Sequence, residues 1–326
     1  MTPPDQNPEN QDAANQDPTD RDPVDQDAGK PHFGRVTVIG TGLIGSSLLR
    51  VFREQGMADE LVGSARRQET RDRILELGLV DRAVEDPGEA VDGADLVIIA
   101  IHLGGYEDIA KAIGPHLKPG AIVTDVGSAK EVTFSAMQPH LPAHAHLVPG
   151  HPIAGTEFSG PDAGFAELFQ DRWCILTPTA ETDPAAVETV KAMWRAAGSA
   201  VEIMDPEHHD LVLAITSHLP HVIAYTIVGT ATELEEDVQA EVIKFSAGGF
   251  RDFTRIAATK PDFWRDVFVT NRDAVLEVLD RFTEDLSALR RAIRRSDADE
   301  IMARLARTQD VRKNVIELGQ DSEWRR

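Results

Sequence analysis

Three glycines in the stretch Val36–Gly45 have the spacing that binds the phosphates of a dinucleotide. The stretch opens with four β-branched residues typical of a strand, and an apolar pattern of helical period follows it. In this context Gly40 permits a tight turn, Gly42 lets the backbone approach a pyrophosphate, and Gly45 lets helix and strand pack closely. The N-terminus of the helix would offer free N–H groups to the phosphates. We predict cofactor contacts from Gly40, Thr41, Gly42, Leu43, Ile44 and Gly45, and from Ile101 at the end of a later strand.

A histidine in the segment Pro149–Glu157 is the first candidate for proton transfer. His151 stands between a glycine and a proline just after an apolar run, so we expect stiff, irregular backbone there rather than a core position. Histidine titrates near neutral pH and can therefore take or give a proton. The segment Asp125–Lys130 also follows an apolar strand, at the sheet edge where open α/β folds bind ligands. Its Ser128 fits such a site, and it equally fits the cap of an ordinary strand-to-helix turn.

Polar residues that could line a pocket recur in the C-terminal half. The run His208–Asp210 opens a long helical pattern, and His218 and His221 follow on one helix face, three residues apart. That spacing could hold a metal ion, but no third ligand stands at a fitting distance. A structural or polar-pocket role is therefore favoured, and we expect no metal. Pro220 lies inside the pattern and should kink the helix.

Two arginines accompany a break in the helical pattern at Ala247–Arg255. A guanidinium presents a fork of donors that suits a carboxylate, so Arg255 and Arg251 are candidates for binding an acidic substrate. A surface ion pair with Asp252 is an alternative role for Arg251.

The elements that must position these residues alternate between strand and helix as far as Met204. The strand-like runs are continuously apolar, as expected for a parallel sheet covered on both faces. The expected strands are Val36–Ile39, Leu61–Gly63, Leu96–Ile101, Ala121–Asp125, Leu147–Gly150, Trp173–Thr177 and Ala200–Met204, and the helices between them include Thr70–Leu77 and Pro184–Ala197.

Helical periodicity dominates after Asp205, which together with Pro206 forms a good helix start. We predict an α/β fold: an N-terminal Rossmann domain with a doubly wound parallel sheet over residues 32–204, then an all-α C-terminal domain over residues 205–326. The expected C-terminal helices are Leu211–Val228, Pro261–Ile293 and Asp297–Leu318.

Composition narrows the class of protein. The 326 residues exceed the size at which a single core keeps growing, and 41% of them are apolar. The net charge of −22 argues against nucleic acid as a partner, since phosphate binding needs a basic face. Residues 1–31 are rich in Asp, Gln, Pro and Asn and almost lack apolar side chains, so we expect a disordered acidic tail.

The same composition points to a cytoplasmic protein. No apolar run approaches the roughly 20 residues of a membrane span, and no signal segment opens the chain. The single cysteine, Cys174, permits no internal disulfide, and its apolar surroundings in the sequence are typical of a buried small hydrophobic residue.

In their order and spacing these segments resemble the prephenate and arogenate (cyclohexadienyl) dehydrogenase family of tyrosine biosynthesis. The resemblance extends from about Val36 to Arg272. It implies a Rossmann domain, a helical domain that forms a homodimer, and an active site in the cleft between them. The implied reaction is oxidative decarboxylation of prephenate or arogenate with hydride transfer to NAD(P). The matching segments are the glycine loop, Asp125–Lys130, Gly150–Glu157, Ser217–His221 and Gly248–Arg255.

The resemblance also implies a role for each candidate residue. His151 would accept the proton of the ring hydroxyl as hydride leaves the same carbon, and Ser128 would contact that hydroxyl and support the histidine. Arg255 would bind a substrate carboxylate, and His221 would shape that polar end of the pocket. The remaining implied positions are Thr156 and Glu157 near the substrate side chain, Trp264 reaching across the dimer, and the supporting residues His209, Asp210, His218 and Asp252.

The choice between NAD and NADP depends on the end of the second strand. NAD enzymes usually place an acid there for the ribose hydroxyls, whereas no acid stands in Leu61–Ala65. Arg66 and Arg67 follow instead, and two arginines suit a 2′-phosphate, so NADP is favoured over NAD. Stacking of one arginine on the adenine is the alternative.

Two other functions share parts of this pattern. A 3-hydroxyacid dehydrogenase has the same plan of a Rossmann domain and helices but usually relies on a lysine in the helical domain, and neither Lys244 nor Lys260 sits in that motif. A dinucleotide-sensing regulator without turnover would have no reason to keep His151, Ser128 and Arg255 together.

The sequence gives little information about which substrate the enzyme prefers and how its activity is regulated. No single residue decides between the keto group of prephenate and the amino group of arogenate. The segment after Asp297 has room only for helices, so we expect no regulatory domain. L-tyrosine, if it inhibits, should therefore compete with the substrate.

Overall fold

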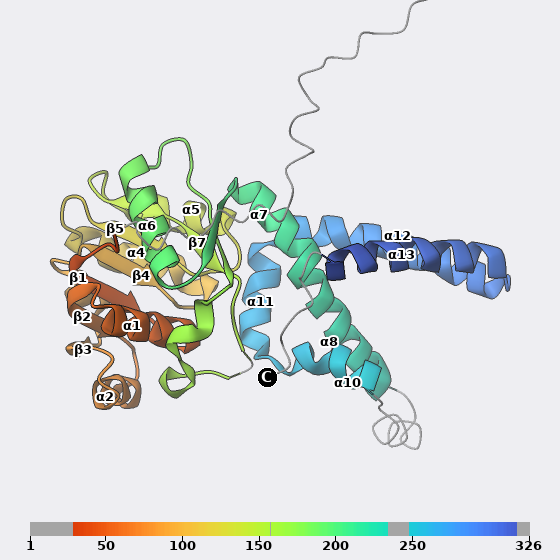
Figure 1. Cartoon of the computed structure of the whole chain (residues 1–326), viewed down its shortest axis with the longest axis horizontal. Coiled ribbons are helices and arrows are strands. Elements are labelled where there is room, and N and C mark those ends of the chain that lie inside the picture. The colour runs from red at the N-terminus through yellow and green to blue at the C-terminus, as the bar shows by residue number, and fades with distance from the viewer. Residues whose placement is uncertain (1–28, 157, 234–247, 318–326) are drawn as a thin grey trace, which may run out of the picture. The chain divides into compact units, whose positions relative to one another are not determined.

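The computed structural model of the chain describes residues 29–156, 158–233 and 248–317 (Figure 1). Two compact units divide it: one extends to Leu279, and the other begins at Asp280. The predicted acidic tail, residues 1–31, lies almost wholly outside the described residues, and so does Glu157.

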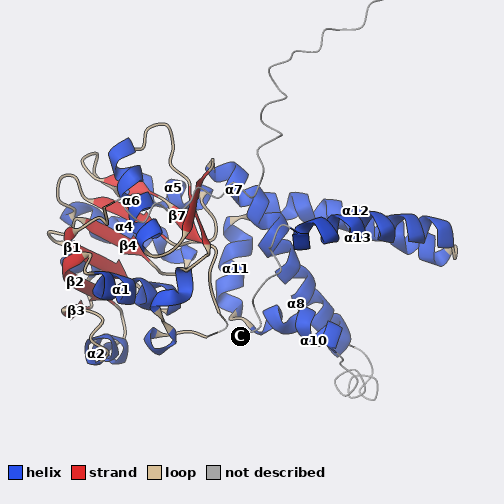
Figure 2. Cartoon of the chain, viewed as in Figure 1, coloured by secondary structure: helices blue, strands red, loops and turns tan. Residues whose placement is uncertain are grey.

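The larger unit begins with a six-stranded, entirely parallel sheet in the order β3-β2-β1-β4-β5-β6 (Figure 2). The strand order reverses at β1, which lies between β2 and β4, and this is where doubly wound sheets bind dinucleotides. The predicted Rossmann sheet is confirmed, with one short strand, β3, that the apolar pattern did not indicate. The strands are β1 Phe33–Ile39, β2 Ala58–Ser64, β3 Arg82–Val84, β4 Leu96–Ile99, β5 Ile122–Asp125 and β6 His146–Val148.

Two hydrophobic clusters cover the two faces of this sheet. In β4, Leu96 and Ile98 pack into a cluster that includes α1 and α6, whereas Val97 and Ile99 pack into a second cluster that includes α4 and α5. All four side chains are fully buried, which explains why the strand is apolar without alternation. The helices of this part are α1 Leu43–Gln55, α2 Gln68–Glu76, α3 Pro87–Val91, α4 Tyr106–Ile113, α5 Glu131–Met137 and α6 Pro184–Ala196.

The last three strands form a separate sheet, which corrects the expectation that they continue the parallel one. β7 (Gly150–Pro152) pairs antiparallel with β8 (Trp173–Leu176), and β8 pairs parallel with β9 (Ala200–Ile203). The predicted strand Leu147–Gly150 is in fact the end of β6 and the start of β7. Between them stands Pro149, which has no N–H for a sheet ladder, and here the chain leaves one sheet for the other.

The helical part begins where the sequence predicts. Asp205 precedes α7, and Pro206 is its first residue. The predicted helix Leu211–Val228 is interrupted by a π turn at Ala214–His218, just before Pro220, and the predicted helix Pro261–Ile293 divides in two at Asn271. The helices are α7 Pro206–Leu213, α8 Leu219–Thr232, α10 Gly248–Thr254, α11 Pro261–Thr270, α12 Arg272–Arg294 and α13 Ala298–Glu317.

One described helix, Pro206–Ala231, is long and apolar enough to cross a membrane by length and composition, with a mean hydropathy of 1.6. This helix corrects the expectation that no apolar run approaches the length of a membrane span. The run is hard to recognise in the sequence because polar residues interrupt it. Two polar residues at the start of this helix, His209 and Asp210, are buried and hydrogen-bonded to residues of the Rossmann part. These bonds tie the helix into the folded chain, since burying such groups without partners is costly.

Candidate active site

The glycine loop between β1 and α1 has the shape that its three glycines predict. Gly40 has a φ of +92°, and a Cβ there would lie 2.4 Å from the carbonyl oxygen of Ala100. A Cβ at Gly45 would lie 2.1 Å from the carbonyl oxygen of Gly40, so the helix can start this close to the strand only with glycine. At Gly42 no atom lies within 4 Å of such a Cβ. The backbone of Gly42 therefore faces open space that phosphates can fill.

The start of α1 fits an anionic cofactor. Its first turn holds no acidic residue, and the capping residue Gly42 has no side chain to bond the first N–H groups, which stay free for phosphates. Thr41 buries a hydroxyl that has no hydrogen-bond partner among the described residues, and Leu43 and Ile44 are partly exposed. The Cγ2 atom of Ile101 lies 2.7 Å from the Cβ position at Gly40 and so borders the loop.

The end of β2 lacks an acid that could bind ribose hydroxyls. The strand ends at the buried Ser64, and the side chains of Arg66 and Arg67 are exposed just beyond it. Arg71 fixes this turn because its Nη1 donates to the carbonyl oxygens of Ala65 at 2.8 Å and Arg66 at 2.9 Å. Neither Arg66 nor Arg67 forms an ion pair with a described residue.

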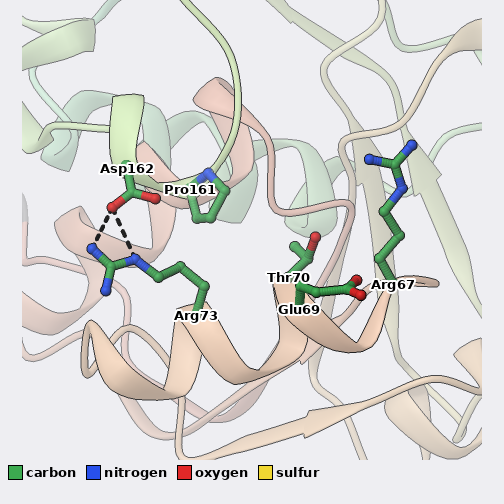
Figure 3. A pocket seen from close by; sticks show the side chains of 6 residues that line it. All are labelled: Arg67, Glu69, Thr70, Arg73, Pro161 and Asp162. Atoms are coloured by element: carbon green, nitrogen blue, oxygen red, sulfur yellow. Dashed lines mark hydrogen bonds and ion pairs between the residues drawn. The ribbon is translucent and has the colours of Figure 1, made fainter.

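A shallow depression of about 550 Å³ adjoins this turn (Figure 3). Arg73 and Asp162 close one side of it with an ion pair in which Arg73 Nε lies 2.9 Å from Asp162 Oδ1. The hydrogen bonds from Arg73 hold the pKa of Asp162 below its usual range. Arg67 stands apart from that pair in Figure 3, so its charge is available to a ligand. The lining residues are Arg67, Glu69, Thr70, Arg73, Pro161 and Asp162.

His151, on β7, is the last of three side chains that hydrogen bonds connect in series: Asp210, His209 and His151. The carboxylate of Asp210 lies 2.7 Å from Nδ1 of His209, and Nε2 of His209 lies 2.9 Å from Nδ1 of His151. A carboxylate accepts only, so the proton of neutral His209 is on Nδ1 and its Nε2 accepts from His151. His151 then carries its proton on Nδ1 and a free lone pair on Nε2. The geometry thus prepares Nε2 of His151 to accept a proton.

The surroundings of His151 favour its neutral form. Burial lowers the pKa of His151 well below the ordinary histidine value, and the neighbouring His209, Lys130 and His218 lower it further. Burial also lowers the pKa of His209. Both rings are therefore neutral at physiological pH, as a proton acceptor requires.

Asp210 is fixed by helix α5 as well as by His209. Its Oδ1 accepts the backbone N–H of Lys130 at 2.7 Å, and its Oδ2 accepts that of Glu131 at 3.0 Å. These are two of the N–H groups that a helix start leaves without partners inside the helix. The carboxylate thereby caps α5 from a different helix and cannot rotate away from His209.

The buried His218 joins the same network through Asn271. The amide Nδ2 of Asn271 donates to the carbonyl oxygen of Asp210 at 2.9 Å and lies 3.0 Å from Nδ1 of His218. Nδ1 of His218 is thus an acceptor, and its proton is on Nε2, which has no hydrogen-bond partner among the described residues. Burial lowers the pKa of His218 to about 4.

His221 and Trp264 form the next layer. Their rings stack with centroids 3.5 Å apart, and Nδ1 of His221 donates to the carbonyl oxygen of Ser217 at 2.9 Å. Trp264 is only 6% exposed and also contacts the ring of His218. The family resemblance implied a tryptophan that reaches across a dimer. Within its own chain Trp264 packs against these two histidine rings, and its Nε1 has no hydrogen-bond partner among the described residues; the implied contact across a dimer stays a prediction.

Ser128 shares this property of a buried, unpaired polar atom. Its hydroxyl has no partner among the described residues, so no hydrogen bond joins it to His151. Buried polar atoms are rarely left unpaired in native proteins, and those at functional sites commonly await a ligand or water. A bound ligand or water could therefore form a hydrogen bond with each of three buried atoms: Oγ of Ser128, Nε2 of His218 and Nε1 of Trp264.

The remaining candidates are not linked to the histidine network by any contact among the described residues. Arg255 is exposed at the start of a 3₁₀ turn, Arg255–Ala258. Asp252 is exposed too, and its Oδ1 lies 3.9 Å from Nε of Arg251. The hydroxyl of Thr156 accepts the backbone N–H of Phe158 at 3.3 Å. Glu157 lies outside the described residues.

Sequence reasoning assigned no role to the residues that hold the network in place. Asp125 and Lys130 are fully buried and paired, and Asn271 links two histidine-bearing segments. One signal was available for Asp125: an acid at the end of a continuously apolar strand must be buried, and a buried charge needs a partner.

The Rossmann sheet with its glycine loop indicates a dinucleotide-binding enzyme, and comparison with known proteins identifies the family. Two family models match the chain, "Prephenate dehydrogenase, nucleotide-binding domain" over residues 48–203 and "Prephenate dehydrogenase, dimerization domain" over residues 205–307. A cyclohexadienyl dehydrogenase of Zymomonas mobilis is 42% identical over 281 residues, covering 86% of this chain and 95% of the relative. A prephenate dehydrogenase of Bacillus subtilis is 32% identical, covering 86% and 76%.

Similar solved structures belong to the same family. Prephenate dehydrogenase from Aquifex aeolicus in complex with hydroxyphenyl propionate and NAD+ has a TM-score of 0.80 and 32% identity, covering 86% of this chain and 98% of that one. Synechocystis arogenate dehydrogenase has a TM-score of 0.74 and 28% identity, covering 86% and 99%. The chain belongs to the prephenate dehydrogenase family and is an oxidoreductase.

Proposed function

We propose that the chain catalyses the oxidative decarboxylation of prephenate, arogenate or both, as a step of tyrosine biosynthesis. The observation that carries this proposal is the hydrogen-bonded order Asp210, His209, His151, which leaves a lone pair on Nε2 of His151. Relatives named for prephenate, arogenate and cyclohexadienyl substrates all align with the chain over more than four-fifths of its length.

His151 performs the proton transfer in this proposal. The bound nicotinamide supplies the hydride acceptor. Nε2 of His151 takes the proton of the ring hydroxyl as the hydride leaves the same carbon. When the ring carboxylate departs as carbon dioxide, its bonding electrons complete the aromatic ring, and His151 returns the proton to the ring oxygen. Prephenate thus yields an aromatic keto acid, carbon dioxide and reduced nucleotide without net release of a proton.

The residues around His151 orient and hold the reacting groups. His209 and Asp210 fix the tautomer of His151 and stabilise the imidazolium that forms for a moment. The unpaired hydroxyl of Ser128 binds the ring hydroxyl. None of these steps needs a metal ion.

The substrate's acidic groups engage the helical part. Arg255 binds a carboxylate, because its guanidinium is exposed and forms no ion pair with a described residue. His221, stacked on Trp264, shapes the polar end of the pocket. Thr156 contacts the substrate side chain, and Asp252 supports the arginine segment. Glu157 lies outside the described residues and keeps the role near the side chain that the family resemblance implies.

We favour NADP over NAD as the cofactor. Ser64 stands at the end of β2, where an acid would select NAD. The exposed side chains of Arg66 and Arg67 follow it, and neither forms an ion pair with a described residue. The Aquifex relative was crystallised with NAD+, so the chain would differ from it in this preference.

A homodimer in the cytoplasm is the form we propose for the enzyme. The matched dimerization model covers most of the helical part. The described chain leaves large apolar side chains exposed on α12 and α13, which a partner subunit would cover: Leu286, Ile293, Met302, Leu305 and Val311. Cys174 is free and buried, as suits a reducing compartment.

Steady-state assays of the purified protein test the function directly. Prephenate and arogenate are each offered with NAD and with NADP, and reduced nicotinamide and released carbon dioxide are both measured. We expect the two products in equal amounts with at least one substrate. Reduction without carbon dioxide would indicate a simple alcohol dehydrogenase, and no turnover with either substrate would contradict the proposal.

A further inference from the structure

Asp125 and Lys130 form an ion pair whose side chains are both fully buried. Lys130 Nζ lies 2.6 Å from Oδ2 of Asp125, at the end of β5. The same oxygen accepts the hydroxyl of Tyr106 and the backbone N–H of Gly127, each at 2.9 Å. Burying two charges costs free energy that hydrophobic residues of the same volume would not, so such a pair suggests a use beyond stability.

The pair holds both polar backbone atoms of Gly150, the residue before His151. Oδ1 of Asp125 accepts the N–H of Gly150 at 3.1 Å, and Nζ of Lys130 donates to its carbonyl oxygen at 2.7 Å. A Cβ at Gly150 would lie 3.1 Å from Leu176 and 3.3 Å from the backbone oxygen of Asp125, so the strand is also closely packed. The backbone that carries His151 is therefore fixed at its preceding peptide.

Lys130 holds the other end of the histidine network too. Its backbone N–H donates to Oδ1 of Asp210 at 2.7 Å, and the same oxygen lies 2.7 Å from Nδ1 of His209. One residue thus contacts both the strand that bears His151 and the carboxylate at which the hydrogen-bonded series starts.

We propose that Lys130, paired with Asp125, is a positioning residue for proton transfer, which fixes His151 and Asp210 in the geometry that leaves Nε2 of His151 free. This inference rests on the proposed function of His151. Lys130 makes no contact with the imidazole of His151 among the described hydrogen bonds, so it acts through backbone and charge.

The charge of Lys130 gives the proposal a second readout. It is one of the groups that lower the pKa of His151, after burial and His209. Removing that charge should therefore raise the pKa of His151, with the other surroundings unchanged. The charged and titratable groups around His151 are His209 and Asp210 on α7, His218 in the π turn, Asp125 on β5, Cys174 on β8 and Lys130 itself.

The decisive variants are Lys130→Met and the double variant Asp125→Asn with Lys130→Met. The single variant leaves Asp125 as an unpaired buried charge and should unfold at lower temperature. The double variant removes both charges with side chains of similar size and should recover much of that loss. Tyr106→Phe is the matched control, because it removes one bond to the same carboxylate and leaves both contacts to Gly150 intact.

We expect the double variant to separate stability from activity. Its kcat should fall by about 10²-fold with KM little changed, the usual effect of a small misplacement of catalytic groups. In Lys130→Met, which keeps the carboxylate of Asp125, the acid limb of the pH profile and the pKa of His151 read by NMR of labelled histidine should both move upward. Tyr106→Phe should lose stability yet keep the acid limb of the wild type.

Three results would overturn the proposal. The double variant could regain wild-type turnover along with its stability, or it could fail to fold; in both cases the pair serves only the fold. The pKa of His151 could also stay unchanged in Lys130→Met. A wild-type protein without turnover would contradict the proposed function instead, and the NMR readout on Lys130 would still apply.

Discussion

Nδ1 of His151 and Nε2 of His209 lie 2.9 Å apart, with their rings edge to face at 66°. Two neutral imidazoles can share one hydrogen bond only if one nitrogen donates and the other accepts. Asp210 decides which, because its carboxylate accepts a hydrogen bond from the Nδ1–H of His209. A residue of the helical part thus sets the tautomer of a histidine on β7 and leaves the lone pair of that histidine on Nε2.

The first prediction concerns this pair. His151→Asn should lower kcat by roughly two to four powers of ten, the usual contribution of general acid–base catalysis, with substrate binding retained. His209→Asn should give an intermediate loss, since His151 remains but its tautomer is no longer fixed. Stopped-flow or steady-state kinetics would measure both. His208→Asn is the control: the side chain next to His209 is exposed, and turnover should not change. Normal turnover in His151→Asn would remove that residue from the mechanism.

The second prediction is an unusually low acid limb in the pH profile. His151 must be neutral to accept a proton, and burial lowers its pKa well below the ordinary histidine value. Activity should therefore persist as the pH falls through about 6.5 and decline only below it, whereas a histidine with an ordinary pKa would give a limb at about 6 to 7. The pH dependence of kcat/KM measures it, and a limb above 6.5 would contradict the assigned surroundings.

Acid unfolding must be separated from that limb. His218 has a pKa of about 4 in the folded chain, against about 6.5 when unfolded, so below 6.5 the unfolded state binds the proton first. The stability due to neutral His218 is complete above 6.5 and is lost as the pH falls, by about 3 kcal/mol near pH 4. Circular dichroism and thermal unfolding at each pH would show where the fold, rather than His151, limits activity.

The third prediction concerns the substrate carboxylate. Arg255→Ala should raise KM at least tenfold, because loss of a charge-assisted contact costs about 1.5–3 kcal/mol. Arg251→Ala is the matched control, since that side chain is 76% exposed and lies near Asp252. A KM that rises for Arg251→Ala and not for Arg255→Ala would assign the carboxylate to the other arginine.

The fourth prediction tests the cofactor. Replacing Arg66 and Arg67 together by alanine should weaken NADP far more than NAD, because only NADP has a 2′-phosphate that loses its counter-charges. Fluorescence titration with both reduced nucleotides gives the two affinities. Arg82→Ala, which breaks a surface pair with Glu89 elsewhere, should leave their ratio unchanged. Equal losses for both nucleotides would indicate stacking on the adenine and remove the preference for NADP.

The sequence was sufficient for features that depend on local pattern. The glycine loop is one, because turn, phosphate approach and close packing each need glycine at one position, and the structure has φ +92° at Gly40 and open space at Gly42. The parallel sheet is another, since strands buried on both faces must be apolar throughout. The start of α7 at Pro206 is a third, because proline suits the first helical position, although the side chain of Asp205 makes no capping hydrogen bond.

Features that depend on distant residues could not be predicted. The change of sheet at Pro149 depends on where β8 lies, and that strand is more than twenty residues further along the chain. Lys130 reaches Gly150 and Asp210 only once the chain is folded. The low pKa of His151 comes from burial, which the residue type does not reveal.

The last prediction is that L-tyrosine, if it inhibits, competes with the substrate. Tyrosine keeps the ring hydroxyl and the amino-acid side chain of arogenate, so it can meet the lone pair of His151 and the polar end formed by His221 and Trp264. It lacks the ring carboxylate and cannot use that group's contacts, so it should bind less tightly than the substrate. Initial rates at several tyrosine concentrations decide the question. Double-reciprocal lines that meet on the velocity axis indicate a shared site, and tyrosine should protect His151 from diethyl pyrocarbonate. Inhibition that excess substrate does not relieve, or a sigmoidal response, would place tyrosine at a separate site.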